Sequence, residues 1–142
     1  MSPVEPFTIT RAIDAPPQRV FEAWTQPDQA GWWLDPDGEW SAPPELISME
    51  LRPGGTWRMT FVDDAGTEYP AAFVYQDVVA GERLAFTTGT LAEADALATV
   101  TFAERNGATE QTFQSHAAPA QARELRRDWS QMFDRLAAQV AR

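Results

Sequence analysis

The chain of 142 residues contains no cysteine, no lysine and a single histidine, His116. The absence of cysteine excludes disulfide bonds and thiolate metal sites. Zinc and iron sites normally draw on several histidine or cysteine side chains, so we expect no metal and no cofactor. Ser115 and His116 are neighbours on a predicted strand and point to opposite faces, which argues against a serine–histidine catalytic pair.

Long apolar runs and clustered cations are also missing. No segment approaches the roughly 18 apolar residues that cross a bilayer, and the N-terminus lacks the basic start and apolar stretch of a secretion signal. The net charge of −10 would repel a phosphate backbone. We therefore expect a cytoplasmic protein without nucleic-acid partners and without membrane insertion. Length and composition, with 44% hydrophobic residues, fit one globular domain over residues 1–142.

Hydrophobic periodicity predicts a strand and two short helices at the start of the chain. Residues 7–13 alternate between apolar and polar side chains, which is the period of a half-buried strand. Over residues 16–24 a proline pair precedes apolar side chains at helical spacing, which favours a short helix. Pro27 ends this helix and begins a second one that runs to Trp33.

About six further strands and a long helix follow. The first of these strands is predicted at residues 46–51, and the run at residues 69–79 is long enough to be a bent strand. The Asn106-Gly107 pair predicts a tight hairpin. From residue 125 to residue 140 the apolar side chains keep to one face of a helix about 33 Å long. The sequence thus predicts an α+β fold, with an antiparallel sheet of about seven strands wrapped around a long C-terminal helix.

Four runs of sequence point to a family by their order and spacing. They are PPQRVFEAWTQPDQAGWW at residues 16–33, LRPGGTWRM at 51–59, TEYPAAFVYQDVVAGERLAFT at 67–87 and WSQMFDRLA at 129–137. Together they resemble the heat-shock protein 90 ATPase activator-like family of the SRPBCC (START and Bet v 1-like) superfamily. The chain departs from the usual family pattern at Gln111, where an aliphatic residue is more common.

The resemblance implies a helix-grip fold with a cavity between the sheet and the C-terminal helix, in a superfamily whose members bind lipids, sterols, polyketides and other apolar molecules. The residues expected to line this cavity share the inward phase of the strands or the apolar faces of the helices. They are Trp33, Trp57, Met59, Phe61, Phe73, Tyr75, Phe86, Phe102, Gln111, Phe113, Ser115, Trp129 and Phe133.

Plain core packing is the alternative for each aromatic residue of this set, because such residues fill most protein cores. Trp33 in particular either lies near the mouth of the cavity or seals the core, with Trp32 partly exposed. Gln111 and Ser115 favour a cavity, since they place polar groups on an apolar face. Buried polar groups need partners, which a ligand or trapped water can supply.

Three functions fit such a cavity. The first is non-catalytic binding of a small apolar molecule, lipid-like or aromatic and polyketide-like, with no catalytic residues. The second is an aromatase- or cyclase-type enzyme in which Tyr75, Gln111 or Ser115 polarises carbonyl groups. The third is an interaction module that acts on a chaperone or on a second copy of the chain, as a homodimer.

The chaperone activity that the family name suggests is expected to be absent. The eukaryotic activator engages the chaperone through an additional N-terminal domain, whereas this chain begins directly at the first predicted strand. We therefore rank binding of a small apolar molecule first.

Overall fold

The computed structural model describes residues 5–34, 43–87, 97–117 and 119–141. Seven strands form one antiparallel sheet in the spatial order β1-β7-β6-β5-β4-β3-β2. The strands are β1 (Glu5–Ile13), β2 (Ser48–Met49), β3 (Thr56–Val62), β4 (Glu68–Val79), β5 (Arg83–Thr87), β6 (Leu97–Arg105) and β7 (Ala108–Ala117). The helices are α1 (Pro17–Thr25), α2 (Pro27–Trp33) and α3 (Pro119–Val140), with a short 3₁₀ helix, η1 (Pro44–Leu46). The predicted α+β helix-grip fold is confirmed.

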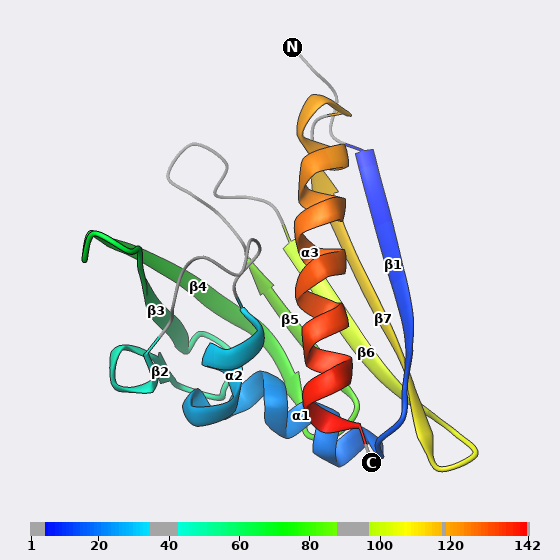
Figure 1. Cartoon of the computed structure of the whole chain (residues 1–142). Coiled ribbons are helices and arrows are strands. Elements are labelled where there is room, and N and C mark those ends of the chain that lie inside the picture. The colour runs from blue at the N-terminus through cyan, green and yellow to red at the C-terminus, as the bar shows by residue number, and fades with distance from the viewer. Residues whose placement is uncertain (1–4, 35–42, 88–96, 118, 142) are drawn as a thin grey trace.

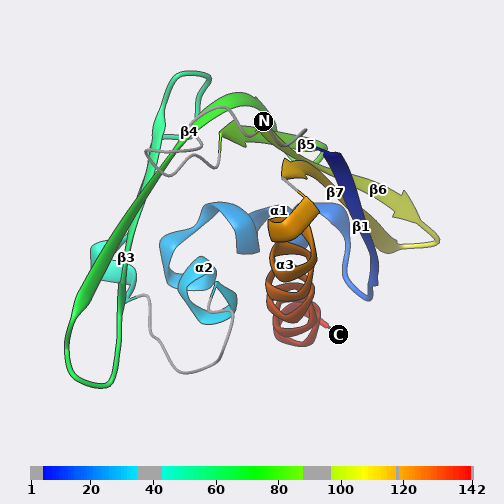
Figure 2. The same cartoon turned by 90° about the horizontal axis from the view of Figure 1, so that it is seen from above.

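The sheet curls around the long helix α3 (Figures 1 and 2). In Figure 2, β3 and β4 stand at one end of the curved sheet, β1 and β7 stand at the other, and the three helices occupy the space between them. Helix α3 contacts β1 and β7, and α2 contacts both α1 and α3. The core therefore lies between the concave face of the sheet and the three helices.

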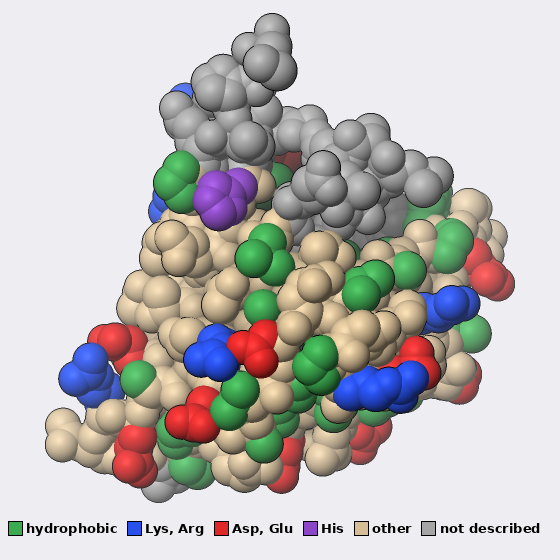
Figure 3. Space-filling model, turned by 180° about the vertical axis from the view of Figure 1, so that it is seen from behind, with side chains coloured by type: hydrophobic (Ala, Val, Ile, Leu, Met, Phe, Trp, Pro, Cys, Tyr) green, Lys and Arg blue, Asp and Glu red, His purple; other side chains and the backbone are tan. Residues whose placement is uncertain are grey.

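Strand β6 illustrates how the sequence separates the two faces of the sheet. Ala98, Val100 and Phe102 are buried, whereas Thr101 and Ala103 between and after them are exposed. Figure 3 shows the molecule from behind, where arginine and acidic side chains are interspersed with hydrophobic and other side chains. One face of the sheet is thus apolar and covered, and the opposite face meets water.

Helix α3 buries the apolar face that its sequence pattern predicts. Met132, Phe133, Leu136 and Val140 are buried at helical spacing, and Pro119 stands at the first helical position. Each fully buried side chain of this kind contributes roughly 1.5–3 kcal/mol relative to its exposed state. No helix within the described ranges combines the length and the hydropathy that a bilayer span requires.

The strand predicted at residues 46–51 is shorter in the structure. Only Ser48–Met49 pairs with β3, and the residues before it form η1. The proline pair at residues 43–44 fixes the backbone for this turn, in which the Leu46 N–H donates to the Pro43 carbonyl at 2.9 Å. Strand β2 therefore starts two residues later than the hydrophobic periodicity predicts.

Strand β4 is bent as predicted, and its bend lies at Tyr75. The register with β5 shifts between Tyr75 and Asp77, which marks a β-bulge. On the other side of β4, the Tyr75 carbonyl accepts from the Gly54 N–H at 2.7 Å and the Tyr75 N–H donates to the Gly55 carbonyl at 2.9 Å. The backbone of Tyr75 is therefore held from both sides.

The hairpin predicted at Asn106-Gly107 is confirmed. Both residues have positive φ angles, 56° and 84°, as a type I′ turn requires. This turn connects β6 to β7 and aligns Phe102 opposite Gln111.

Candidate ligand-binding site between the sheet and helix α3

The structure brings all of the predicted cavity residues to the concave side of the sheet. The buried members are Trp33, Trp57, Met59, Tyr75, Phe86, Phe102, Gln111, Phe113, Ser115 and Phe133. The remaining three, Phe61, Phe73 and Trp129, are partly buried and pack against the same core. Trp33 is sealed in the core, whereas its neighbour Trp32 is 74% exposed.

A continuous set of rings, here called the aromatic cluster, connects the sheet to α3. Its members are Trp24, Trp33, Trp57, Phe73, Tyr75, Phe86, Phe102, Phe113, Trp129 and Phe133. The centroids of Trp24 and Trp33 are 4.7 Å apart, and those of Phe113 and Trp129 are 4.6 Å apart. Rings from the sheet and from all three helices thus pack into one apolar body.

Trp24 lies at the centre of this cluster, although the sequence did not place it among the cavity residues. Its ring contacts those of Trp33, Trp57, Phe86, Phe102, Trp129 and Phe133. The helical spacing over residues 16–24 predicts that Trp24 faces inward. Only the packing of α1 shows that this inward direction leads into the concave side of the sheet.

Gln111 is fully buried on β7 and is held by Trp24. The Trp24 indole N–H donates to Oε1 of Gln111 at 2.9 Å. The amide nitrogen Nε2 of Gln111 is also buried, and it has no hydrogen-bond partner among the described residues. Since the bond from Trp24 fixes the amide oxygen, it also fixes the direction in which this unpartnered nitrogen points.

Two further unpartnered polar atoms lie on β3 and β4. The rings of Trp57 and Tyr75 are nearly parallel, with an angle of 9° and centroids 6.1 Å apart. Neither Trp57 Nε1 nor the Tyr75 hydroxyl has a hydrogen-bond partner within the described part of the chain, and both atoms are shielded from solvent. Burial raises the pKa of Tyr75, so the phenol stays protonated near neutral pH.

Several other buried polar groups do find partners. The Trp33 indole N–H donates to the Ala23 carbonyl at 2.9 Å, and the Thr109 hydroxyl donates to the Ala15 carbonyl at 2.7 Å. The Ser115 hydroxyl, expected to face a ligand, donates to the Leu97 carbonyl at 3.2 Å. Ser115 is therefore satisfied inside the protein, unlike Gln111.

Arg11 brings a charge to the edge of this site, and the sequence analysis did not single it out. It pairs across the strands with Gln111 and shares the inward phase of β1. Its Nη2 atom is 3.0 Å from Asp134 Oδ1 and donates to the Ser130 carbonyl at 3.3 Å. The charge of the guanidinium is thus balanced by Asp134 of α3, whereas its buried Nε atom has no hydrogen-bond partner among the described residues.

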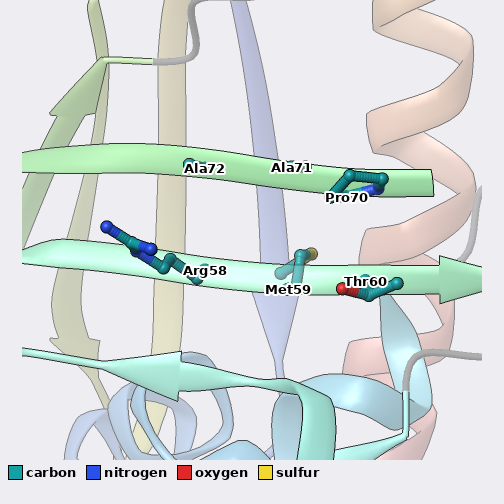
Figure 4. Close-up of a pocket in the computed structure, with 6 residues that line it drawn as sticks. All are labelled: Arg58, Met59, Thr60, Pro70, Ala71 and Ala72. Atoms are coloured by element: carbon teal, nitrogen blue, oxygen red, sulfur yellow. The ribbon is translucent and has the colours of Figure 1, made fainter. Parts of the chain in front are cut away.

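A separate hollow of about 340 Å³ follows the β3–β4 hairpin (Figure 4). Its lining residues are Arg58, Met59, Thr60, Pro70, Ala71 and Ala72. Arg58 and Thr60 alternate along β3 with the buried Trp57 and Met59, so they belong to the outward-facing set. The hollow touches the edge of the core at Met59 and does not include the unpartnered polar atoms.

The arrangement around the aromatic cluster offers apolar surface and hydrogen-bond donors. The unpartnered donors on its uncharged side chains belong to an indole, a phenol and an amide. His116 is exposed. Within the described ranges, no group of acidic and histidine side chains could hold a metal ion.

Comparison with known proteins identifies the family. The family model described as activator of Hsp90 ATPase homolog 1-like protein matches residues 14–141. A search of curated proteins finds no match.

Solved structures of bacterial proteins share the fold over nearly the whole chain. A protein from Chromobacterium violaceum is 25% identical, with a TM-score of 0.83 over 97% of this chain and 99% of its own. An AHSA1-like protein from Aeromonas hydrophila is 20% identical, with a TM-score of 0.84 over 96% of this chain and 92% of its own. A protein from Rhizobium leguminosarum is 26% identical, with a TM-score of 0.75 over 99% and 96%.

These matches confirm the family resemblance read from the four sequence runs, and they agree with the SRPBCC superfamily. The fold is of a type found in ligand-binding domains. The chain belongs to the activator of Hsp90 ATPase homolog 1-like family.

Proposed function

We propose that the protein binds a small, largely apolar molecule between the curved sheet and helix α3. The observation that carries the proposal is that three buried polar atoms of uncharged side chains have no partner among the described residues, namely Trp57 Nε1, Tyr75 Oη and Gln111 Nε2. Buried polar groups are nearly always hydrogen-bonded, so each of these atoms calls for a partner from outside the chain, such as a ligand or an ordered water molecule. A few polar groups within apolar surroundings are the usual composition of a small-molecule site.

Access to these atoms requires side-chain movement, because they are shielded from solvent. Two rings of the aromatic cluster are only partly buried and can move outward. Phe73 lies beside Trp57, with centroids 4.8 Å apart, and Trp129 stacks on Trp24 at 6.2 Å. The proposal therefore includes displacement of one of these rings by the ligand.

An aromatase- or cyclase-type reaction in the same place is the second candidate. The protonated Tyr75 phenol and the Gln111 amide could polarise a carbonyl group, as oxyanion-hole donors do. Acid–base chemistry would additionally call for a group that transfers protons near neutral pH. The buried groups at this site donate hydrogen bonds without titrating in that range, which favours binding.

A thermal-shift screen tests the proposal against fatty acids, sterols, flavonoids and polyketide-like aromatic compounds. A ligand at about 100 times its Kd stabilises the fold by roughly 2.7 kcal/mol, a shift of several degrees in Tm. We expect a dose-dependent rise that falls by at least half in Trp57→Ala and in Phe133→Leu.

Trp32→Ala is the matched control, since Trp32 is 74% exposed and lies outside the aromatic cluster. The conservative Phe133→Leu variant keeps the test informative if Trp57→Ala does not fold. Equal shifts in all variants would place the ligand elsewhere, and the absence of any shift across the four classes would reject the proposed function.

A further inference from the structure

We infer that the ligand of this site is an uncharged molecule that accepts hydrogen bonds, through carbonyl or ether oxygens, from Trp57, Tyr75 and Gln111. This inference rests on the proposed function, because it requires a molecule between the sheet and α3. It adds the polarity and the charge of that molecule, which neither the fold nor the family specifies.

The direction of two of the three hydrogen bonds follows from the chemistry of the atoms, and the Tyr75 phenol, which can donate or accept, can donate to the same acceptor. An indole N–H and an amide NH₂ can only donate. The acceptor atom of the Gln111 amide is already occupied by the Trp24 N–H at 2.9 Å, so only the donating side of this amide is free. A molecule that satisfies these groups must therefore present acceptor atoms.

The absence of net charge follows from the surroundings of the donors. Tyr75 remains a neutral phenol because burial raises its pKa. The charge of Arg11, opposite Gln111, is balanced by Asp134 at 3.0 Å, so its buried Nε atom offers one further donor but no unpaired charge. A carboxylate buried beside the three donors would lack a free counter-charge, and an unpaired buried charge is far more costly than a neutral carbonyl.

The donors are held in place before the ligand arrives. The bond from Trp24 orients the Gln111 amide, and the Gly54-Gly55 turn holds the Tyr75 backbone through bonds of 2.7 and 2.9 Å. The stacked Trp57 ring supports the Tyr75 phenol from β3. Such pre-organisation reduces the entropy that binding must otherwise overcome.

The unpartnered donors also have a cost in the free protein. A buried donor without a partner destabilises the folded state by the desolvation of that group, which replacement by an apolar group removes. A donor that bonds only to a ligand can therefore be told apart by experiment from a donor that bonds to another group of the protein. Its removal raises the stability of the free protein and lowers the affinity for the ligand.

Three ring compounds of nearly equal shape test the inference by calorimetric titration. The probes are 9-fluorenone, which carries one neutral carbonyl, fluorene, which carries no acceptor, and fluorene-9-carboxylate, which is charged. We expect fluorenone to bind at least tenfold more tightly than the other two. In Tyr75→Phe and Trp57→Phe the preference for fluorenone over fluorene should fall to threefold or less.

Tyr69→Phe is the control for Tyr75→Phe, because Tyr69 is the other tyrosine of the chain, is 41% exposed and lies outside the aromatic cluster. Its preference for fluorenone should equal that of the unmodified protein. Chemical denaturation of the two variants, without any ligand, should show that Tyr75→Phe shifts the midpoint upward and Tyr69→Phe does not.

The outcomes separate the two proposals. If fluorene or the carboxylate binds as tightly as fluorenone, the inference is wrong, and the proposed function stands. If Tyr75→Phe shifts the denaturation midpoint downward, the phenol has a partner inside the protein, and the inference is overturned without reference to any ligand. If none of the three compounds binds and the broader screen is also negative, the proposed function fails together with the inference.

Discussion

The indole N–H of Trp24 donates a hydrogen bond of 2.9 Å to the side-chain oxygen of Gln111, and this contact joins α1 to β7 inside the core. Both side chains are fully buried. Gln111 is also the position where the chain departs from the aliphatic residue expected in the family. The Gln111 amide at this position is bound by the Trp24 indole, which indicates that the amide has a defined orientation.

Replacing Tyr75 by phenylalanine should stabilise the free protein. The Tyr75 hydroxyl is buried and has no hydrogen-bond partner among the described residues, so its removal recovers a desolvation cost of about 1 kcal/mol. Urea denaturation of the variant should show this gain in the free energy of unfolding. The control Tyr69→Phe removes a hydroxyl that donates to Asp63 Oδ2 at 3.1 Å, and it should show no gain. A loss of stability in Tyr75→Phe would contradict the prediction.

The two tyrosines should titrate differently at high pH. Burial raises the pKa of Tyr75, whereas the hydrogen bond to Asp63 raises the pKa of the solvent-exposed Tyr69. When the folded-state pKa of a tyrosine is raised, the free energy of unfolding is unaffected by its titration below the unfolded pKa of about 10 and falls as the pH rises above that value. In Tyr69→Phe, phenolate absorbance should therefore appear only together with unfolding. Phenolate formation in the folded variant would show that Tyr75 is accessible.

Gln111→Glu should make stability strongly dependent on pH. The new carboxyl group keeps an acceptor for Trp24, but its ionised form would be buried opposite Arg11, whose charge is already paired with Asp134, so its folded-state pKa should be raised above about 4.3. The free energy of unfolding of the variant should therefore be most similar to that of the unmodified protein below that pH. It should fall as the pH rises and the carboxyl group ionises. We expect a deficit of about 3 kcal/mol or more at pH 7. Equal deficits at pH 4 and pH 7, measured by denaturation of both proteins, would refute this.

Gly55→Ala should destabilise the fold by strain. A Cβ atom at residue 55 would lie 2.0 Å from the backbone oxygen of Glu50, in the turn that holds Tyr75. We expect a loss of about 3 kcal/mol in the free energy of unfolding, within the range of severe single substitutions.

Gly66→Ala provides the comparison for Gly55→Ala. Gly66 has a φ of +82° and no atom within 4 Å of its added Cβ, so only the backbone penalty of about 1–2 kcal/mol applies. Equal losses in the two variants would show that the turn relaxes around the added methyl group at residue 55.

The sequence by itself determined the elements and their faces. Hydrophobic alternation placed Trp57 and Met59 on the covered side of β3. Helical spacing placed Met132 and Phe133 on the buried face of α3, and the Asn106-Gly107 pair specified the β6–β7 hairpin. These features depend on neighbouring residues and on the period of each element, so they can be read locally. The order and spacing of four such runs also sufficed to indicate the family.

Only the tertiary structure decided which polar groups have partners. Gln111 and Ser115 occupy the same face of β7 and were equivalent in the sequence, yet Ser115 reaches the Leu97 carbonyl while the Gln111 nitrogen reaches no described partner. The same holds for Trp24, whose central place depends on how α1 packs against the curved sheet. A hydrogen bond requires two atoms within about 3 Å, and residues far apart in the sequence meet at that distance only through the complete packing of the core.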